Sequence, residues 1–439
     1  MNPEHRHPSP TLPGARPASQ GKEKLSDSPS RPATQPGDAR GRRPSLGNTI
    51  SRRLWPLDGE KLSARARQRV GLEDFGNPPI EPALSVLVES IKSEADLHPL
   101  GRFLARTHLQ DILETRLRLI NAWKNCQDME LQELRRPIFV TGTPRSGSTF
   151  LHELLAEDPA HRAPLVWEVM YPLRSPKPTL GNGTAQVWRA EASLWWFRRL
   201  APQADAVYPM RANTPHECVA IQSYSLLSQE FISTFRIPTY EAFLDDADLF
   251  PAYAWQKRFL QYLQAGRPPG RWVLKSPDHV RSLDALWQAF PDAVIIQTHR
   301  NPLEVLVSSS HLTEVLRQTF ARPVERRQIG VREAHVLAEN MDRITRFRDA
   351  HPELADRFID VQYPELIADP EATVRRVYQK LGVDLQEKAA ARMRHLAANR
   401  RRYANGRGTR PTLAEFGLDA RTEVRRFENY CSRFGIACS

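Results

Sequence analysis

Short apolar runs alternate with helix-like segments along the second two thirds of the chain. The first run, residues 138–140, stops at Gly142 and is followed by the helical pattern of STFLHELLAEDP. Similar runs occur at residues 271–276, 293–299 and 357–363, each before a helix-like stretch. Apolar strands that alternate with helices are typical of a parallel sheet covered on both faces. The pattern therefore predicts a three-layer α/β fold.

The region before the first apolar run has two parts. Residues 1–55 are rich in Pro, Ser, Gly and Arg and show no apolar period. Such a segment buries too little surface to offset the entropy of ordering, so we expect a disordered tail. Apolar residues between Leu109 and Trp123 recur every three or four positions. This spacing predicts a long amphipathic helix in a helical region, residues 56–135, that precedes the α/β domain.

Residues 173–265 interrupt the alternation of strands and helices. Their pattern is mostly helical, and a basic context surrounds four aromatic residues: Trp188, Trp195, Trp196 and Phe197. An insertion beyond the carboxyl end of a strand usually shapes the ligand crevice of such a sheet. We therefore expect an acceptor pocket or a lid here, and packing of the aromatic residues into a core is the alternative.

FVTGTPRSGSTF, residues 139–150, has the spacing of a phosphate-binding loop. Gly142 and Gly147 hold the two glycine positions, and Thr149 stands where the magnesium-binding hydroxyl would be. The lysine that neutralises the phosphates of a nucleoside triphosphate is replaced by Ser148. The loop therefore predicts a phosphate site that is not the usual triphosphate site.

A loop that leads into a helix N-terminus suits a phosphate even without the lysine. Its backbone N–H groups are unpaired, and the positive end of the helix dipole faces the anion. Five consecutive residues add one guanidinium and three hydroxyl groups to these donors: Arg145, Ser146, Gly147, Ser148 and Thr149. We expect this loop to bind a phosphate, and a purely structural glycine turn is the alternative.

A second basic site follows the apolar run at residues 293–299. A triphosphate enzyme typically has a magnesium-binding acid at the end of a neighbouring strand, but this run is followed by Arg300. Asn301 and Pro302 are typical of an N-cap and a first helical residue. Ser308 then lies about two turns along that helix, on the same side as its start. We expect Arg300 and Ser308 to bind a second phosphate without a metal.

The composition of the chain indicates where the protein is located and which kinds of partner it binds. We find no apolar run long enough to cross a bilayer and no secretory segment in the polar N-terminus, so we expect a cytoplasmic protein without a transmembrane segment. The formal net charge is +11. More than half of the excess lies in residues 1–55, which we interpret as a solvated basic tail and not as a specific nucleic-acid-binding arm. The four cysteines form no CxxC pair, which argues against a disulfide scaffold and a zinc site.

Taken together, these motifs resemble the sulfotransferases that use 3′-phosphoadenosine 5′-phosphosulfate (PAPS). The resemblance runs from about residue 136 to the C-terminus and is carried by TGTPRSGSTFLHELLAEDP, WVLKSPDH, THRNPLEVLVSS and VQYPELIADPEATVRRVYQKLG. The likeness is greatest to the bacterial-type branch with PRSGST-like and LKSPxH-like segments. It implies transfer of a sulfuryl group from PAPS to an acceptor hydroxyl, or less readily an amine, of a small molecule, lipid or carbohydrate. No metal is implied.

The resemblance also implies how the donor is held. Residues 145–149 would bind the 5′-phosphosulfate, and Arg300 with Ser308 would hold the 3′-phosphate. Tyr363 matches a tyrosine that packs near the adenine. A basic C-terminal segment would close over the 3′-phosphate, with four candidate residues: Arg401, Arg402, Gly406 and Arg407. A solvated charge run is the alternative for that segment.

Three residues are candidates for the chemistry of transfer. Lys275 matches the family lysine beside the transferred group. The base that takes the proton of the acceptor is Glu168, by likeness to tyrosylprotein and several carbohydrate sulfotransferases, or His279, by likeness to the cytosolic enzymes. We favour Glu168, because PLVWE would place its carboxylate at the end of the second strand, facing the loop. PHEC, residues 215–218, resembles a segment of the acceptor region.

Two other classes of function remain open on the sequence. One is a P-loop kinase or another NTPase, which Ser148 and Arg300 disfavour. The other is a protein that keeps the nucleotide pocket only for binding or assembly.

Overall fold

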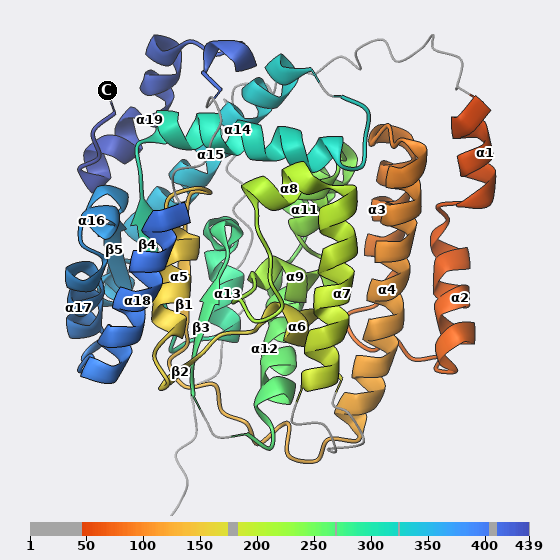
Figure 1. Ribbon diagram of the computed structural model, residues 1–439, viewed down its shortest axis with the longest axis horizontal. Coiled ribbons are helices and arrows are strands. Elements are labelled where there is room, and N and C mark those ends of the chain that lie inside the picture. The colour runs from red at the N-terminus through yellow and green to blue at the C-terminus, as the bar shows by residue number, and fades with distance from the viewer. Residues whose placement is uncertain (1–45, 174–182, 268–269, 324, 404–410, 439) are drawn as a thin grey trace, which may run out of the picture. The chain divides into compact units, whose positions relative to one another are not determined.

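The structure is a computed structural model that describes residues 46–173, 183–267, 270–323, 325–403 and 411–438 (Figure 1). All of them belong to one compact unit. Most of the tail predicted for residues 1–55 lies outside the described residues.

The predicted end of the tail is wrong. Leu46–Leu54 forms helix α1, which contacts the long helix α4 (Pro99–Lys124), and Ser51 is buried. A contact with a distant helix stabilises this short segment, and no local periodicity reveals such a contact.

A five-stranded parallel sheet lies at the centre of the C-terminal part, in the order β2-β3-β1-β4-β5. The strands are β1 (Ile138–Gly142), β2 (His161–Arg162), β3 (Arg271–Lys275), β4 (Val294–His299) and β5 (Phe358–Gln362). The predicted α/β fold is confirmed, and a strand lies at each of the four predicted runs, with β1 two residues longer than its run. The two-residue strand β2 is too short to give a hydrophobic pattern.

The register of the central strands brings three loops to one edge of the sheet. In β1, Val140 pairs with Lys275 of β3 on one side and with Ile296 of β4 on the other. Gly142 pairs with Thr298. Because all of these strands are parallel, the glycine loop, Lys275 and Arg300 leave the sheet at the same carboxyl edge.

Helices cover both faces of the sheet, as three layers require. The alternation along β1 sends Ile138 and Val140 to one hydrophobic cluster and Phe139 to the other. The first cluster is completed by α5 (Ser148–Ala156), α16 (Tyr363–Ala368), α17 (Pro370–Leu381) and α18 (Glu387–Tyr403). The second includes residues of α12 (Phe250–Gln264), α13 (Leu283–Ala289), α14 (Pro302–Gln318), α15 (Arg326–Ala350) and α19 (Ala420–Phe434).

The helical N-terminal region shares this second core. It consists of α2 (Gly59–Val70), α3 (Glu81–Glu94) and α4, whose apolar residues belong to the same buried cluster as those of α12. Arg116 of α4 is fully buried and donates to the carbonyls of Phe75 and Tyr224 at 2.8 and 2.7 Å. Its guanidinium lies 4.4 Å from the ring of Trp255. The N-terminal helices therefore pack against the insertion as part of one core.

The predicted insertion is helical. Helix α6 (Val166–Met170) precedes it, and in chain order it contains α7 (Thr184–Leu200), α8 (Pro202–Val207), α9 (Cys218–Gln222), α10 (Glu230–Thr234), α11 (Pro238–Asp246) and α12. Four 3₁₀ segments complete the described chain: η1 (Ser223–Ser225), η2 (Pro277–Arg281), η3 (Pro352–Arg357) and η4 (Ala414–Phe416). No helix within the described ranges is long and apolar enough to cross a membrane.

The four aromatic residues singled out in the insertion do not behave alike. Phe197 packs against a small buried cluster that includes Ala201. The three tryptophans of α7, at positions 188, 195 and 196, are exposed. Core packing therefore explains only the phenylalanine.

Candidate active site

The glycine loop between β1 and α5 has a backbone that only small residues tolerate. Gly142 and Gly147 have φ angles of 129° and 92°. A Cβ atom on Gly147 would lie 2.8 Å from Cδ2 of Tyr363, and one on Gly142 would lie 2.3 Å from the carbonyl oxygen of Thr298. Gly147 is the N-cap of α5, so the first N–H groups of that helix have no intrahelical partner. The loop therefore has the backbone of an anion site.

The side chains of the loop point in two directions. The hydroxyl of Ser146 is buried, donates to the carbonyl of Thr143 at 2.5 Å and shares a hydrogen bond with Thr298 at 2.6 Å. Ser148 is also buried, whereas Arg145 is exposed and Thr149 is half-buried. Ser146 thus anchors the loop to β4, and a phosphate contact from either serine stays a prediction.

The structure brings the two predicted phosphate sites into contact. Nε of Arg145 donates to Oγ of Ser308 at 3.0 Å, and Nη1 of Arg300 donates to the backbone carbonyl of Arg145 at 2.9 Å. The guanidinium of Arg300 also lies 4.2 Å from the ring of Tyr363. Glu304, 56% exposed, pairs with Arg300 at 2.6 Å. An anion that binds Arg300 must therefore compete with an exposed surface carboxylate.

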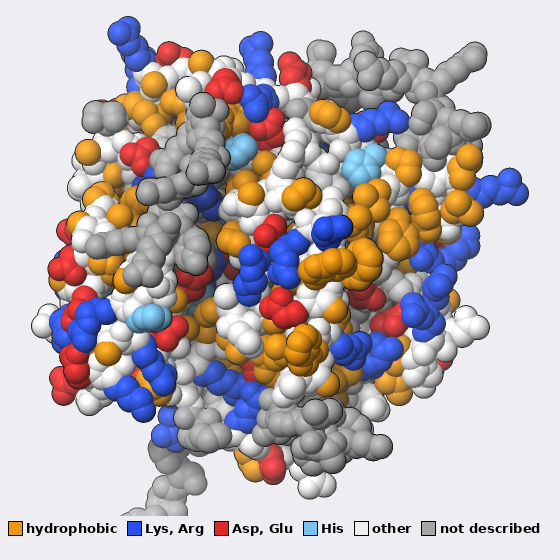
Figure 2. All heavy atoms as spheres, viewed as in Figure 1, with side chains coloured by type: hydrophobic (Ala, Val, Ile, Leu, Met, Phe, Trp, Pro, Cys, Tyr) orange, Lys and Arg blue, Asp and Glu red, His pale blue; other side chains and the backbone are white. Residues whose placement is uncertain are grey.

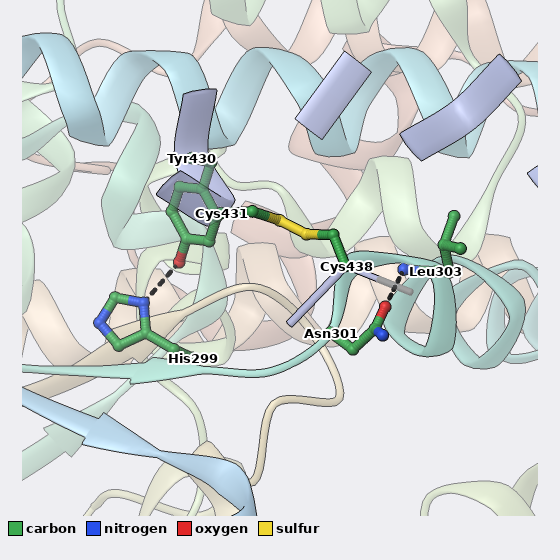
Figure 3. The surroundings of a disulfide bond; sticks show 6 residues. All are labelled: His299, Asn301, Leu303, Tyr430, Cys431 and Cys438. Carbon is green, nitrogen blue, oxygen red and sulfur yellow. Dashed lines mark hydrogen bonds between the residues drawn. A yellow bond between two sulfur atoms is a disulfide. The ribbon is translucent and has the colours of Figure 1, made fainter. Parts of the chain in front are cut away.

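The end of β4 and the start of α14 hold Arg300 in this place. The predicted N-cap is confirmed, because the side chain of Asn301 accepts from the N–H of Leu303 at 2.9 Å and Pro302 follows it. The buried His299 contacts the hydroxyl of Tyr430 in α19 at 2.8 Å (Figure 3). The two residues that flank Arg300 in the chain are thus both held by hydrogen bonds.

His299 also contacts a charged pair on its other side. Its Nε2 lies 2.8 Å from Asp360, which pairs with Arg348 at 2.6 Å. Burial raises the pKa of the Asp360 carboxyl, but hydrogen bonds from His299 and Arg348 outweigh it and hold this pKa well below its usual value. The carboxylate is therefore charged at neutral pH and fixes the imidazole.

A disulfide that the cysteine spacing did not predict lies next to this site. It joins Cys431, in the last turn of α19, to Cys438 (Figure 3). Gly435 ends the helix in a left-handed conformation, with a φ of 63°, and the N–H of Ile436 bonds back to the carbonyl of Cys431 at 2.9 Å. The chain reverses there, so the pairing depends on a helix end and not on a sequence motif.

Lys275 connects the glycine loop to a buried acid. It ends β3, is 2% exposed, and its Nζ donates to Oγ1 of Thr149 at 3.2 Å. The same Nζ forms a close ion pair with Glu217, whose carboxylate also accepts from the hydroxyl of Tyr208 at 2.8 Å. Burial raises the pKa of the Glu217 carboxyl. The charge and hydrogen bond of Lys275 and the hydrogen bond of Tyr208 outweigh that effect and leave the pKa below its ordinary value.

Glu217 is the site residue that the sequence reasoning missed. It is the N-cap of α9, and the preceding Pro215 forms an isolated bridge with Leu165 while the N–H of His216 bonds to the carbonyl of Pro164 at 2.7 Å. The only signal was the acid in PHEC, a segment that resembles the acceptor region of the family.

A second carboxyl group lies near Lys275. Burial raises the pKa of Asp278 in η2 to about 6, Arg281 opposes this shift and Glu217 adds to it. Lys275 therefore interacts electrostatically with two acids, and the pKa of Glu217 is lowered whereas that of Asp278 is raised.

Glu168 is not where the sequence predicted it. It lies in α6 and not at the end of a strand. Its carboxylate, 3% exposed, pairs with Arg162 at 3.1 Å and Arg267 at 2.6 Å, and it accepts from the N–H of Leu165 at 3.1 Å. Two arginines therefore hold Glu168 in ion pairs. The second strand ends at Arg162 and α6 begins at Val166, so Glu168 does not lie at a strand end.

His279 lies on the core side of η2. It is 1% exposed, its Nδ1 lies 2.8 Å from the hydroxyl of Tyr253, and its ring packs edge-on against Phe139. Burial lowers its pKa to about 3. The imidazole is therefore neutral at pH 7 and turned away from solvent.

The basic C-terminal segment that was predicted to close over the 3′-phosphate lies only partly within the described residues. Arg401 and Arg402 belong to α18, whose last side chains are not described, and Gly406 and Arg407 lie outside the described residues. Their contact with the 3′-phosphate stays a prediction.

Known proteins resemble this chain in sequence and in fold. Residues 137–387 match the model of the sulfotransferase family. Omega-hydroxy-beta-dihydromenaquinone-9 sulfotransferase Stf3 of Mycobacterium bovis is 28% identical over 278 residues, which cover 61% of this chain and 68% of that protein. The Stf3 of Mycobacterium tuberculosis matches equally.

Two crystal structures resemble most of the fold. The sulfotransferase STF1 from Mycobacterium tuberculosis is 30% identical with a TM-score of 0.70, over 84% of this chain and 98% of that one. The sulfotransferase STF9 from Mycobacterium avium is 26% identical with a TM-score of 0.74, over 87% and 97%. Since the family match spans more than half of the 439 residues, this chain belongs to the sulfotransferase family and is a sulfotransferase.

Proposed function

We propose that the donor is PAPS, with its 5′-phosphosulfate on the glycine loop and its 3′-phosphate beside Arg300. The contact between Arg145 and Ser308 at 3.0 Å, with Arg300 bonded to the same loop, supports this assignment. It gathers two guanidinium groups and the N-terminus of α5 at one edge of the sheet, which suits a ligand with two separate phosphates. We assign the contact with the adenine to Tyr363, whose ring lies 4.2 Å from the guanidinium of Arg300. A kinase is disfavoured by the family and by Arg300 at the position of a metal-binding acid.

Lys275 and Glu217 are the residues that we assign to the chemistry. Lys275 reaches Thr149 of the loop, so its ammonium offsets the charge that builds on the leaving phosphate. Arg145 adds a second positive charge on the loop. Glu217 accepts the proton of the acceptor hydroxyl while the bond from the acceptor oxygen to sulfur forms and the bond from sulfur to the phosphate oxygen breaks.

The ion pair between Lys275 and Glu217 makes the basicity of Glu217 depend on whether the donor is bound. With Lys275 as its partner the carboxylate is a weak base. An anionic donor attracts the same ammonium, which weakens the pair and raises the pKa of Glu217 when the donor is bound. Glu168 and His279 are less suited to act as the base. Glu168 pairs with two arginines, and His279 is buried in the core.

We further propose that the acceptor is the hydroxyl of an amphiphilic lipid. The support is the similarity to Stf3, whose name identifies a menaquinone derivative as its substrate. Assay of the purified chain with hydroxylated polyprenyl quinones, beside a soluble phenol and a sugar, tests this class against the others.

Calorimetric titration in EDTA with adenosine 3′,5′-bisphosphate tests the donor site. Arg300→Ala should weaken binding about tenfold or more, because a charge-assisted contact is worth roughly 1.5 to 3 kcal/mol. Arg375→Ala is a control, since Arg375 also pairs with a glutamate four residues away in a helix, Glu371. Glu304→Gln should act in the opposite direction and tighten binding by up to about fivefold, as expected for an exposed charge. Binding of ATP in the presence of magnesium, with no binding of the bisphosphate, would overturn the proposal.

A further inference from the structure

Helix α7 exposes an apolar face to solvent. Trp188, Trp195 and Trp196 are 73%, 47% and 62% exposed, and Leu200 is 47% exposed. At 100° per residue these four positions fall on one side of the helix, while Ala190 and Leu194 on the other side are buried. Figure 2 shows hydrophobic and basic side chains beside one another over the region of α7, on the face turned towards the viewer. Large exposed apolar patches are typical of interaction surfaces.

The exposed charges that α7 itself carries on this side are positive. Arg189 and Arg199 are exposed on the same side as the tryptophans, and the guanidinium of Arg199 lies 5.4 Å from the ring of Trp195. The single acid of α7, Glu191, is turned inward, where it pairs with Arg198 at 3.4 Å. Tryptophan and arginine without acids are suited to the interface of an anionic bilayer, in which the indole lies at headgroup depth and the guanidinium meets lipid phosphates.

The inner side of α7 holds the segment that lines the active site. Glu191 accepts from the N–H of Ala212 at 2.6 Å, and Arg198 donates to the carbonyl of Met210 at 3.4 Å. This segment follows Tyr208 and leads to Glu217, the two residues bonded beside Lys275. One helix thus connects the exposed face to the catalytic residues.

We propose that the outer face of α7 docks on the surface of an anionic lipid bilayer and presents the active site to an acceptor held in that bilayer. The inference rests on the proposed function, in which the acceptor is a lipid hydroxyl. Docking requires no membrane-spanning segment, because an interfacial helix lies in the plane of the headgroups.

Co-sedimentation of the full chain with vesicles tests the inference, without donor or acceptor. We expect binding to vesicles of equal parts phosphatidylcholine and phosphatidylglycerol, weaker binding to phosphatidylcholine alone, and a decrease with added salt. The double variant Trp188→Ser, Trp196→Ser should lower the partition coefficient about tenfold or more, since two large apolar side chains leave the lipid. Arg199→Glu should lower binding to the anionic vesicles only.

Matched variants elsewhere on the surface serve as controls. Leu131→Ser with Val331→Ser removes two side chains that are 76% and 56% exposed, and Arg425→Glu makes the same charge change on α19. Both should bind vesicles like the wild type. Circular dichroism melting of every variant shows that it is folded.

Three results would overturn the inference. The first is that the double tryptophan variant binds vesicles as well as the wild type does, and the second is that the wild type does not bind vesicles. The third is that the wild type self-associates and the double variant does not, which would make the face an interface between copies of the chain. Calorimetry with adenosine 3′,5′-bisphosphate on the same samples separates this failure from that of the proposed function. If the wild type binds the bisphosphate but not vesicles, only the docking proposal fails. If the wild type does not bind the bisphosphate, only the donor assignment fails.

Discussion

Three acids near the active site have different surroundings, and these decide what each can do. Glu217 bonds to Lys275 and Tyr208 and is 15% exposed, so a hydroxyl can approach it. Glu168 is 3% exposed between two arginines. Asp278 has a pKa raised to about 6 by burial. We therefore assign the base from the surroundings of each acid and not from its residue type.

Replacement of Glu217 tests that assignment. Glu217→Gln keeps a hydrogen-bond acceptor for Lys275 but no longer takes a proton, so kcat should fall by about 100-fold or more. Binding of adenosine 3′,5′-bisphosphate should be kept or tightened, because a negative charge beside the lysine is gone. Initial rates and calorimetry measure the two quantities, and unchanged turnover would exclude this residue as the base.

Glu168→Gln is the comparison that separates a catalytic from a structural acid. It removes the buried negative charge with which Arg162 and Arg267 pair, so we expect a loss of about 3 kcal/mol in the free energy of unfolding. If its purified folded form instead loses turnover at normal stability, the base has been misassigned.

Asp278 gives a pH-dependent stability whose sign is opposite to that of most acids. Its pKa is higher in the folded chain than the ordinary value of 3.8, so the folded state binds the proton more tightly. The free energy of unfolding therefore falls as the pH rises from about 4 to about 6, and Asp278→Asn should recover about 1 to 2 kcal/mol above that window. Urea unfolding at about pH 4 and about pH 8 measures this, with the exposed Asp284→Asn as control. Equal gains at both pH values would contradict the pKa argument.

At the scale of elements, the loop between β1 and α5 depends on a backbone that only glycine supplies. Gly147→Ala forces a Cβ atom against the ring of Tyr363 and into a φ of 92°. We expect a loss of about 2 to 4 kcal/mol in the free energy of unfolding and loss of bisphosphate binding.

Gly382 provides the matched control. It also has a positive φ, of 69°, but no atom lies within 4 Å of the position that a Cβ atom would take there. Gly382→Ala should therefore cost only about 1 kcal/mol, the backbone part of the effect. Equal losses in the two variants, measured by urea unfolding, would show that contact with Tyr363 is unimportant.

For the whole molecule, the N-terminal helices and the sheet share one core, and α1 extends it. Trp55, which directly follows α1, packs edge-on against Phe103 of α4. Deletion of residues 1–45 should leave the Tm unchanged, whereas deletion of residues 1–55 should lower it by about 2 °C or more, because the second exposes the surface of α4. Differential scanning calorimetry of the two truncated chains decides this, and equal Tm values would refute a structural role for α1.

The sequence by itself determined the sheet, the glycine loop, Arg300 with its helix cap, and Lys275. All of these are local: a run of apolar residues, a spacing of glycines, a residue that follows a strand. The interactions that fix such features act within a few residues, so they leave a periodicity or a spacing in the sequence.

Only the tertiary structure decided the partners. Glu217 meets Lys275 because the segment after α8 folds back onto the end of β3, and Glu168 turns inward because two arginines from different elements reach it. Cys431 meets Cys438 because the chain reverses at a helix end. Such contacts join residues far apart in the chain or depend on how a segment turns, and no periodicity records them.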